Sequence, residues 1–418
     1  MKILWLGNII LPLIADIENL PKVYVGGWMV GLSEHLGKLL DYELIYVFDS
    51  DKKLHGETEF YSYYGVENHE RGSNPLSNDY IQKLLAILEK EKPDVIHIWG
   101  TENQHSLAMV QAAQACGMSD NLIISIQGLV SLCSKHYFAY LPEKIINGYT
   151  LKDMIQGNLR KRAKIFLEKG KLEIQAIKHA KHVIGRTDWD KAAVWTINSE
   201  ATYHFNNETL RDEFYSGMWK YEDCEKYSIF CSQAYFPIKG LHLMLEALPT
   251  IKEYYPDVKL YIGGKNYYSL SPLKRNSYEK YILGIIKNKH LADNVVFTGF
   301  LSPKEMKMRY LKCNVFVSPS SIENSPNSVG EAMLLGVPVI SSNVGGVHNM
   351  LEHGKEGYLY PADEPYMLAY YVNEVFEAKH DVEKISYAGR GHAQRTHDQK
   401  QNLEKLLEIY SEVASKLI

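Results

Sequence analysis

Residues 317–346 have the sequence VSPSSIENSPNSVGEAMLLGVPVISSNVGG, which predicts a strand end, a loop, a helix and a second strand. The first strand is the apolar run 314–317. Ser325 is a residue type that caps helix N-termini, Pro326 suits a first helical turn, and Gly336 is typical of a helix end. A helix that begins just after a parallel strand points free N–H groups outward, where they favour a phosphate. The stretch therefore predicts an anion site at the carboxyl edge of a sheet.

Two carboxylates mark this stretch, Glu323 in the loop and Glu331 in the helix. Glu331 directly precedes the apolar run 332–335, so we expect it to be buried. A buried acid needs a hydrogen-bond partner, and a ligand hydroxyl would serve. A solvated loop acid and a helix acid paired with a lysine would give the same spacing, so the spacing alone leaves both alternatives open.

The whole stretch resembles the family 4 retaining glycosyltransferases of the GT-B fold. Their mark is a Glu, seven residues, a second Glu, then Ala-Met, Gly-x-Pro-Val and a Gly-Gly loop. The matching positions are Glu323, Glu331, Ala332-Met333, Gly336 to Val339 and Gly345-Gly346. The resemblance covers nearly the whole chain and is strongest over residues 227–362.

This resemblance implies roles for the residues of the stretch. Glu323 would face the donor sugar, and Glu331 would hold the ribose of the nucleotide. Asn324, Ser328 and Val329 would lie near the sugar and the diphosphate. The family's Glu-Gly-Phe-Gly is Glu-Asn-Ser-Pro here, and Pro326 has no N–H to donate. The contacts to the sugar ring therefore differ from those of the family.

A lysine precedes the helix predicted over residues 241–251. Lysine at a helix start opposes the helix dipole, which suggests that Lys239 holds an anion. The resemblance places Lys239 and Gly240 at the diphosphate. The arginine that the family has five residues earlier is Ala234 here, so we expect another cation near the phosphates.

Two residues at strand ends could supply that cation. Lys265 follows Gly263-Gly264, and Arg186 follows Gly185. We favour Lys265, because it shares a predicted domain with Lys239. Its alternative is a solvated loop lysine.

Two further glycines belong to loops that the resemblance assigns to the donor. Gly299 follows the strand 295–297 and, with Lys265, would lie around the nucleotide base. Gly27 opens a helix after the first strand, 3–6, and would lie under the donor diphosphate.

Strands and helices alternate strictly over residues 80–126, which predicts a doubly wound parallel sheet whose ligands lie beyond the carboxyl ends of the strands. Glu102, His105 and Gln127 fall just past such ends and are candidates for the acceptor and the sugar. Gln127 stands where the family has a histidine that contacts the donor, and glutamine keeps the hydrogen bonding without the proton. For His105 a structural hydrogen bond is the favoured alternative.

The predicted fold class is α/β, with two Rossmann-like doubly wound parallel-sheet domains facing a cleft (GT-B). An acceptor-binding domain would cover residues 1–205, a linker 206–226 and a nucleotide-sugar-binding domain 227–395. An amphipathic helix at about 396–418 would cross back to the N-terminal domain.

Composition narrows the class of protein. A net charge of −4 argues against a nucleic-acid binder. Five unpatterned cysteines and a start without a signal peptide's apolar region favour the cytoplasm. The sequence has no run of eighteen apolar residues, so it predicts no membrane span.

One region favours peripheral contact with the inner face of the cell membrane, residues 129–181. It combines an aromatic loop with a segment, 152–181, that has nine Lys or Arg and three acids. A solvated basic helix over buried aromatics is an equal alternative.

No metal or other cofactor is expected. Asp49-Ser50-Asp51 at a strand end could hold a divalent ion, but short acidic turns are common and the resemblance is to a metal-free fold.

The sequence predicts a retaining hexosyltransferase that moves a sugar from a nucleotide-diphosphate donor to a glycan or lipid-linked acceptor. The resemblance suggests bacterial surface polysaccharide synthesis. A nucleotide-sugar 2-epimerase and a catalytically dead sugar-nucleotide-binding subunit remain alternatives.

Overall fold

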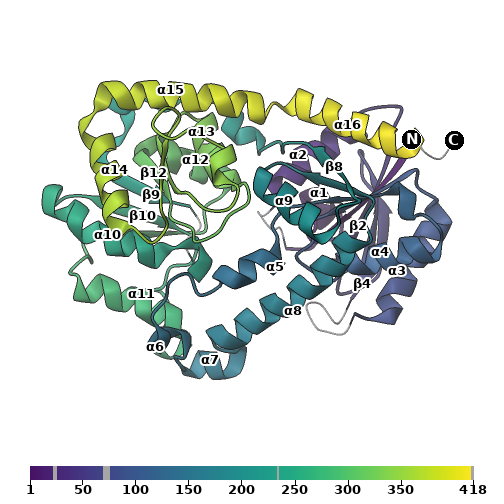
Figure 1. Ribbon diagram of the computed structural model, residues 1–418, viewed down its shortest axis with the longest axis horizontal. Coiled ribbons are helices and arrows are strands. Elements are labelled where there is room, and N and C mark those ends of the chain that lie inside the picture. The colour runs from purple at the N-terminus through teal and green to yellow at the C-terminus, as the bar shows by residue number, and fades with distance from the viewer. Residues whose placement is uncertain (22–25, 69–75, 233–234, 416–418) are drawn as a thin grey trace. The chain divides into compact units, whose positions relative to one another are not determined.

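A computed structural model describes residues 1–21, 26–68, 76–232 and 235–415. The chain divides into two compact units (Figure 1). Unit 1 contains residues 1–132, 166–211 and 397–418, and unit 2 contains residues 133–165 and 212–396.

Unit 1 is built on an eight-stranded sheet in the order β3-β4-β2-β1-β5-β6-β7-β8. Every neighbouring pair is parallel except the antiparallel pair β3 and β4, which the sequence analysis did not predict. The strands are β1 (Lys2–Gly7), β2 (Glu43–Ser50), β3 (Leu54–Glu57), β4 (Ser62–Glu67), β5 (Val95–Trp99), β6 (Leu122–Ser125), β7 (His182–Gly185) and β8 (Thr202–Phe205).

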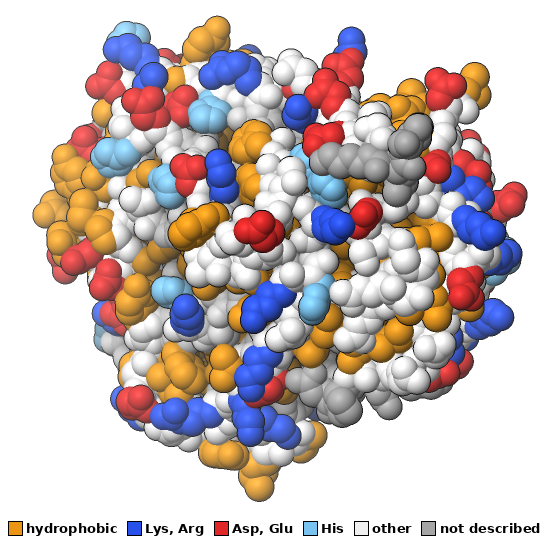
Figure 2. Space-filling model, turned by 45° about the vertical axis from the view of Figure 1, so that its right-hand side comes forward, with side chains coloured by type: hydrophobic (Ala, Val, Ile, Leu, Met, Phe, Trp, Pro, Cys, Tyr) orange, Lys and Arg blue, Asp and Glu red, His pale blue; other side chains and the backbone are white. Residues whose placement is uncertain are grey.

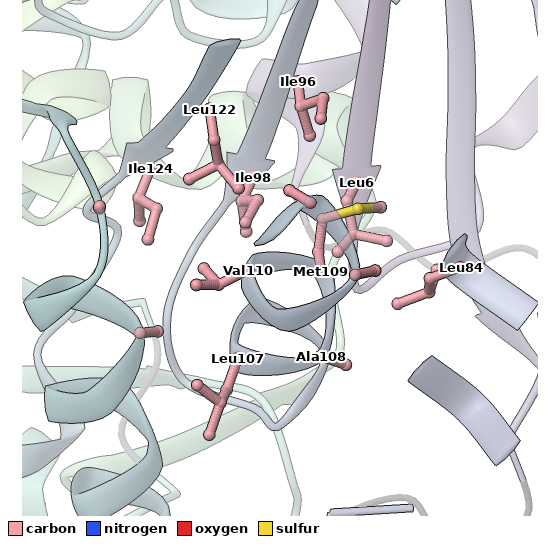
Figure 3. Packing of buried hydrophobic residues seen from close by; sticks show 14 of the residues in the cluster. Leu6, Leu84, Ile96, Ile98, Leu107, Ala108, Met109, Val110, Leu122 and Ile124 are labelled. Carbon is pink, nitrogen blue, oxygen red and sulfur yellow. The ribbon is translucent and has the colours of Figure 1, made fainter. Parts of the chain in front are cut away.

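One face of this sheet packs on long helices. Successive strand residues point to opposite faces, so Ile96 and Ile98 enter the same core as Ile124. Figure 3 shows them meeting Met109 and Val110 of a helix. The helices of this core are α3 (Asn78–Glu91), α4 (His105–Ala115), α8 (Leu159–Lys178) and α9 (Asp188–Ile197).

The opposite face carries Trp5, His97 and Trp99 and is covered by α1 (Pro12–Ile17), α2 (Gly27–Gly37) and α16 (Gln399–Ser415). The Tyr410 hydroxyl of α16 accepts a hydrogen bond from Trp5 Nε1 at 2.9 Å and lies 2.6 Å from His97 Nδ1. His97 Nε2 is 2.6 Å from the Ser125 hydroxyl. This buried network fixes α16 to the N-terminal sheet, which confirms the predicted return of the C-terminal helix.

Unit 2 has a parallel six-stranded sheet in the order β11-β10-β9-β12-β13-β14. Among its helices, α10 packs on α14 and α13 packs on α15. Its strands are β9 (Glu225–Cys231), β10 (Lys259–Gly263), β11 (Val295–Gly299), β12 (Cys313–Ser318), β13 (Val339–Ser342) and β14 (Tyr358–Tyr360). The helices are α10 (Leu241–Tyr254), α11 (Ser277–Asn288), α12 (Pro303–Lys312), α13 (Asn327–Leu334), α14 (Pro365–Glu377) and α15 (Lys379–Thr396).

Residues 133–165 belong to unit 2, which differs from the predicted domain 1–205. They include α6 (Glu143–Ile146), α7 (Leu151–Gln156) and the start of α8. Thr150 and Asp153 form a capping box at α7, and Asp153 Oδ2 also accepts from the backbone N–H of Ser277 at 2.8 Å. Lys152 Nζ contacts both carboxylate oxygens of Glu279 at 3.0 Å. These contacts attach the segment to α11.

The predicted linker 206–226 is also divided, with residues 206–211 in unit 1 and the rest in unit 2. Phe214 and Trp219 are buried, and the Trp219 indole donates to the Cys313 carbonyl at 2.8 Å. Residues 212–226 therefore contribute buried side chains to unit 2.

Candidate functional site

The predicted strand, loop and helix are present as β12, residues 319–326 and α13. Pro326, not Ser325, is the N-cap residue, and no side chain caps the helix. Gly336 follows the helix with a φ of +75° and donates its N–H to the Met333 carbonyl at 2.9 Å. The glycine end of the helix is thus confirmed, and the start lies one residue later than predicted.

Lys239 and Glu323 meet beside this helix. Lys239 Nζ is 2.6 Å from Glu323 Oε1, which also accepts from the Ser320 hydroxyl at 2.7 Å. Both side chains remain partly exposed, at 26% for Lys239 and 13% for Glu323. Two residues that the sequence analysis singled out 84 positions apart therefore form one ion pair.

Two glycines allow the loops of this pair to approach closely. A Cβ on Gly240 would lie 1.7 Å from the Pro319 carbonyl oxygen, and one on Gly345 would lie 1.9 Å from that of Glu323. Both have a positive φ, +71° and +54°. Only glycine meets both conditions without strain.

A pocket of unit 2 brings three predicted residues together, Lys239, Glu323 and Ser328. It lies at the carboxyl ends of β9 and β12, and its empty space is about 270 Å³, open solvent included. Ser328 stands in the first turn of α13. The pocket therefore joins a cation, a carboxylate and a helix N-terminus.

Two neighbours of these residues are buried. Val329 is fully buried, and its backbone N–H donates to the Pro326 carbonyl at 2.9 Å. Asn324 is 5% exposed. Neither is among the residues that line the pocket.

Glu331 is buried as predicted, at 5% exposure. The Tyr310 hydroxyl of α12 lies 3.4 Å from Glu331 Oε2 and 3.0 Å from the Ser328 carbonyl oxygen. A tyrosine therefore links the carboxylate to the first turn of α13, and no sequence signal pointed to it.

The two predicted base loops lie side by side. The backbone N–H of Gly264 donates to the Gly299 carbonyl at 2.9 Å. Lys265 is turned to α11, where its Nζ is 2.6 Å from Glu279 Oε1. Burial alone would raise the pKa of Glu279, but hydrogen bonds from Lys265, Asn276 and Lys152 outweigh it and lower that pKa. Lys265 thus already has a buried counter-charge.

Arg186, the other candidate cation, is 8% exposed in unit 1. Its Nη1 is 2.7 Å from Glu208 Oε1 and 3.2 Å from the Ile126 carbonyl oxygen. A role at the phosphates stays a prediction for both cations. Ala234 lies outside the described residues.

Glu102 and Gln127 meet in unit 1 over Gly100. A Cβ on Gly100 would lie 2.3 Å from Glu102 Oε2 and 3.4 Å from Gln127 Cγ. Glu102 Oε1 accepts from the Gly128 N–H at 3.1 Å, whereas Glu102 Oε2 and Gln127 Nε2 are buried without a partner among the described residues. Burial raises the pKa of Glu102 to about 7. A role of this pair at the acceptor or the sugar stays a prediction.

His105 is fully buried in α4, and burial lowers its pKa. Such a position fits the structural alternative. Gly27 begins α2, and the preceding residues 22–25 are outside the described part of the chain.

No group of three or more His, Cys, Asp or Glu within the described ranges could hold a metal ion. Asp49 accepts hydrogen bonds from the Tyr80 hydroxyl and from Asn68 Nδ2.

The family model of glycosyl transferases group 1 matches residues 220–392, which contain the pocket and both glutamates. Residues 220–392 are therefore similar to the glycosyl transferases group 1. The Bacillus subtilis spore coat protein SA is 32% identical over 177 residues, 41% of this chain and 45% of that protein. The Erwinia amylovora amylovoran biosynthesis glycosyltransferase is 28% identical over 183 residues, 42% of each chain. The chain thus spans about half the length of these relatives.

Two solved structures share the fold over nearly the whole chain. Sucrose-phosphate synthase from Thermosynechococcus elongatus has a TM-score of 0.72 at 14% identity and covers 99% of both chains. Anabaena HepE in complex with UDP and glucose has a TM-score of 0.70 at 16% identity, covering 98% of this chain and 99% of that one. The predicted GT-B fold is confirmed.

Proposed function

We propose that this protein is a retaining glycosyltransferase that moves a sugar from a nucleotide-diphosphate donor to a glycan or lipid-linked acceptor. The observation that carries the proposal is the pocket where Lys239, Glu323 and Ser328 meet inside the matched family region. The names of the two relatives described above, a spore coat protein and an amylovoran biosynthesis glycosyltransferase, support a role in surface polysaccharide synthesis, which we propose for this protein.

The chemistry follows from the charges in the pocket. Negative charge develops on the leaving diphosphate, and preorganised donors stabilise it in the transition state. Lys239 and the free N–H groups at the start of α13 are such donors. Glu323 forms an ion pair with the Lys239 ammonium. In the proposed reaction it would position that cation and stabilise the positive charge that develops on the sugar. No metal takes part in this proposal.

The acceptor hydroxyl would be received in unit 1. Glu102 and Gln127 present an acceptor oxygen and a donor nitrogen that are buried without partners among the described residues. A hydroxyl can donate to the first and accept from the second.

The test is a screen of nucleotide sugars with product analysis by mass spectrometry. Release of the nucleoside diphosphate together with a glycoside supports transfer. An altered sugar on an intact nucleotide would indicate a 2-epimerase, and binding without turnover would indicate a dead binding subunit.

Glu323→Gln sharpens the screen, because it keeps the side-chain shape and removes the charge beside Lys239. We expect turnover to fall by orders of magnitude while the nucleoside diphosphate still binds. Glu352→Gln is the matched control, since Glu352 pairs with Lys355 on the surface of the same unit. Near-normal turnover in Glu323→Gln would refute the role of Glu323.

We also propose reversible contact with the inner face of the membrane through residues 129–181. The side chains of the aromatic loop that was expected to make this contact point largely inward, and Leu129, Tyr137, Leu141 and Ile146 are buried. The exposed apolar side chains of this region are others, and they lie near the basic segment. They are Tyr140, Tyr149, Leu151, Met154, Ile155, Ile165 and Leu167.

Figure 2 shows orange side chains at its lower end, where Figure 1 places α6 and α7, with blue ones near them. Across the described ranges, no helix is both long and apolar enough to cross a bilayer.

We expect binding to anionic vesicles that weakens as salt rises, because lysine and arginine attract the lipid head groups. Met154→Asp with Ile155→Asp should reduce flotation, and Leu40→Asp in unit 1 is the exposed control. Absence of binding at low salt would contradict this contact.

A further inference from the structure

Unit 1 contains a second polar cavity, on the sheet face that α16 covers. It lies at the carboxyl ends of β5, β7 and β8. Its walls include Trp28 from α2, Trp99 from β5, Arg186 after β7, and Glu208 and Thr209 after β8. The pocket of Lys239 and Glu323 belongs to unit 2, so the two sites share no residue.

Four side chains that line this cavity each carry a buried polar atom without a hydrogen-bond partner among the described residues. These atoms are Trp99 Nε1, Arg186 Nε, Glu208 Oε2 and Thr209 Oγ1. Each of these side chains is more than nine-tenths buried, between 4% and 8% exposed. Leaving a buried polar atom unpaired is costly, so such atoms are normally satisfied by protein, water or ligand. Four of them around one space indicate a missing polar partner.

The charges of the cavity define that partner. Arg186 and Glu208 form a 2.7 Å ion pair, so the walls carry no excess of either sign. An anion would meet the Glu208 carboxylate, and a cation would meet the guanidinium. Two of the unpaired atoms are N–H donors, one is a carboxylate acceptor, and the Thr209 hydroxyl can do both. A neutral hydroxyl donates once and accepts twice, so it can pair with three of the four.

Two tryptophan rings add an apolar surface to the wall of the cavity. Trp28 and Trp99 stand with ring centroids 4.9 Å apart beside these polar atoms. A sugar presents C–H groups next to hydroxyls and matches such a mixed wall. The empty space is about 380 Å³ with open solvent included, but only about 20 Å³ admits the centre of a water-sized group. One hydroxyl or hydroxymethyl group fits this space, and a whole sugar ring does not.

We propose that this cavity binds one hydroxyl-bearing edge of a neutral saccharide, and that this saccharide is the acceptor. The binding stands on the cavity alone, whereas the acceptor role rests on the proposed function. Arg186 would accordingly serve the acceptor sugar rather than the diphosphate.

The test uses methyl α-glycosides of glucose, galactose, mannose and N-acetylglucosamine, with binding followed by saturation-transfer NMR on the full chain. Thr209→Val removes one unpaired hydroxyl at constant shape, and Trp99→Phe removes one N–H. Thr196→Val is the matched control, because Thr196 is exposed on α9 in the same unit. Thermal unfolding of each variant shows whether it folds.

We expect at least one glycoside to bind, and both cavity variants to weaken it about tenfold while the control has no effect. Nucleoside diphosphate affinity should stay unchanged in all three variants. The proposal is overturned if no glycoside binds, or if folded Thr209→Val binds as well as wild type, since the cavity then holds only structural water. Glycoside binding without transfer from any donor would refute the proposed function and leave the site intact.

Discussion

Replacing Gly240 with alanine tests the close approach on which the Lys239 site depends. Alanine at a φ of +71° costs about 1–2 kcal/mol. The new Cβ would also lie 1.7 Å from the Pro319 carbonyl oxygen, well inside the 3.0 Å that Cβ atoms keep from other atoms. The loop after β12 must therefore move by more than 1 Å. That movement strains the 2.8 Å hydrogen bond from the Ser321 N–H to the Ile238 carbonyl, worth about 1 kcal/mol.

We therefore expect Gly240→Ala to lower the free energy of unfolding by about 2–3 kcal/mol, measured by urea titration. Gly354→Ala isolates the clash, because Gly354 has a similar φ of +75° and no atom within 4 Å of the added Cβ. It should cost only about 1–2 kcal/mol. Nucleoside diphosphate affinity, measured by calorimetry, should fall at least tenfold in Gly240→Ala alone. Equal destabilisation and equal affinity in the two variants would refute the reasoning.

Three further predictions address the ribose, the metal and a buried histidine. Glu331→Ala should weaken nucleoside diphosphate binding, because a ribose contact stabilises ground and transition states alike; unchanged affinity in calorimetry would remove the ribose role. Turnover should survive excess EDTA, because Lys239 and helix N–H groups neutralise the diphosphate, and a full loss restored by manganese would contradict this. Burial lowers the pKa of His97 from 6.5 to about 3, so below pH 6.5 the unfolded chain binds a proton that the folded chain does not. As the pH is lowered from 6.5 to 5, this histidine should reduce the free energy of unfolding by about 2 kcal/mol. In urea titrations from pH 4 to 7, the free energy of unfolding of His97→Gln should depend less on pH than that of the wild type.

Local patterns in the sequence located most of the candidate site. Glycine, proline and apolar periodicity determine structure through residues that are close together in the chain. The strand, loop and helix of residues 317–346 were therefore predictable to within a residue or two. The apolar run beside Glu331 also predicted its burial correctly. The resemblance added that Lys239 and Glu323 both serve the donor, whereas their ion pair was not predicted.

What the sequence did not predict shares a physical cause, contacts between residues far apart in the chain. Residues 133–165 join unit 2 through Asp153 and Ser277, which are 124 positions apart. The partner of Arg186 is Glu208, in a segment whose lack of periodicity favoured a linker. The Lys265 ammonium meets Glu279 on a separate helix. The sequence around Asp153, Arg186 or Lys265 does not identify the partner of that residue.

The attachment of α16 to the first strand also governs when unit 1 can fold during synthesis. Trp5 and Tyr410 are 405 residues apart, and a ribosome that adds about 5–20 residues per second needs about 20–80 s to make that length. Until then the face of β1 and β5 that carries Trp5, His97 and Trp99 lacks α16, one of the three helices that cover it. Unit 1 therefore completes its core only after unit 2 has been synthesised.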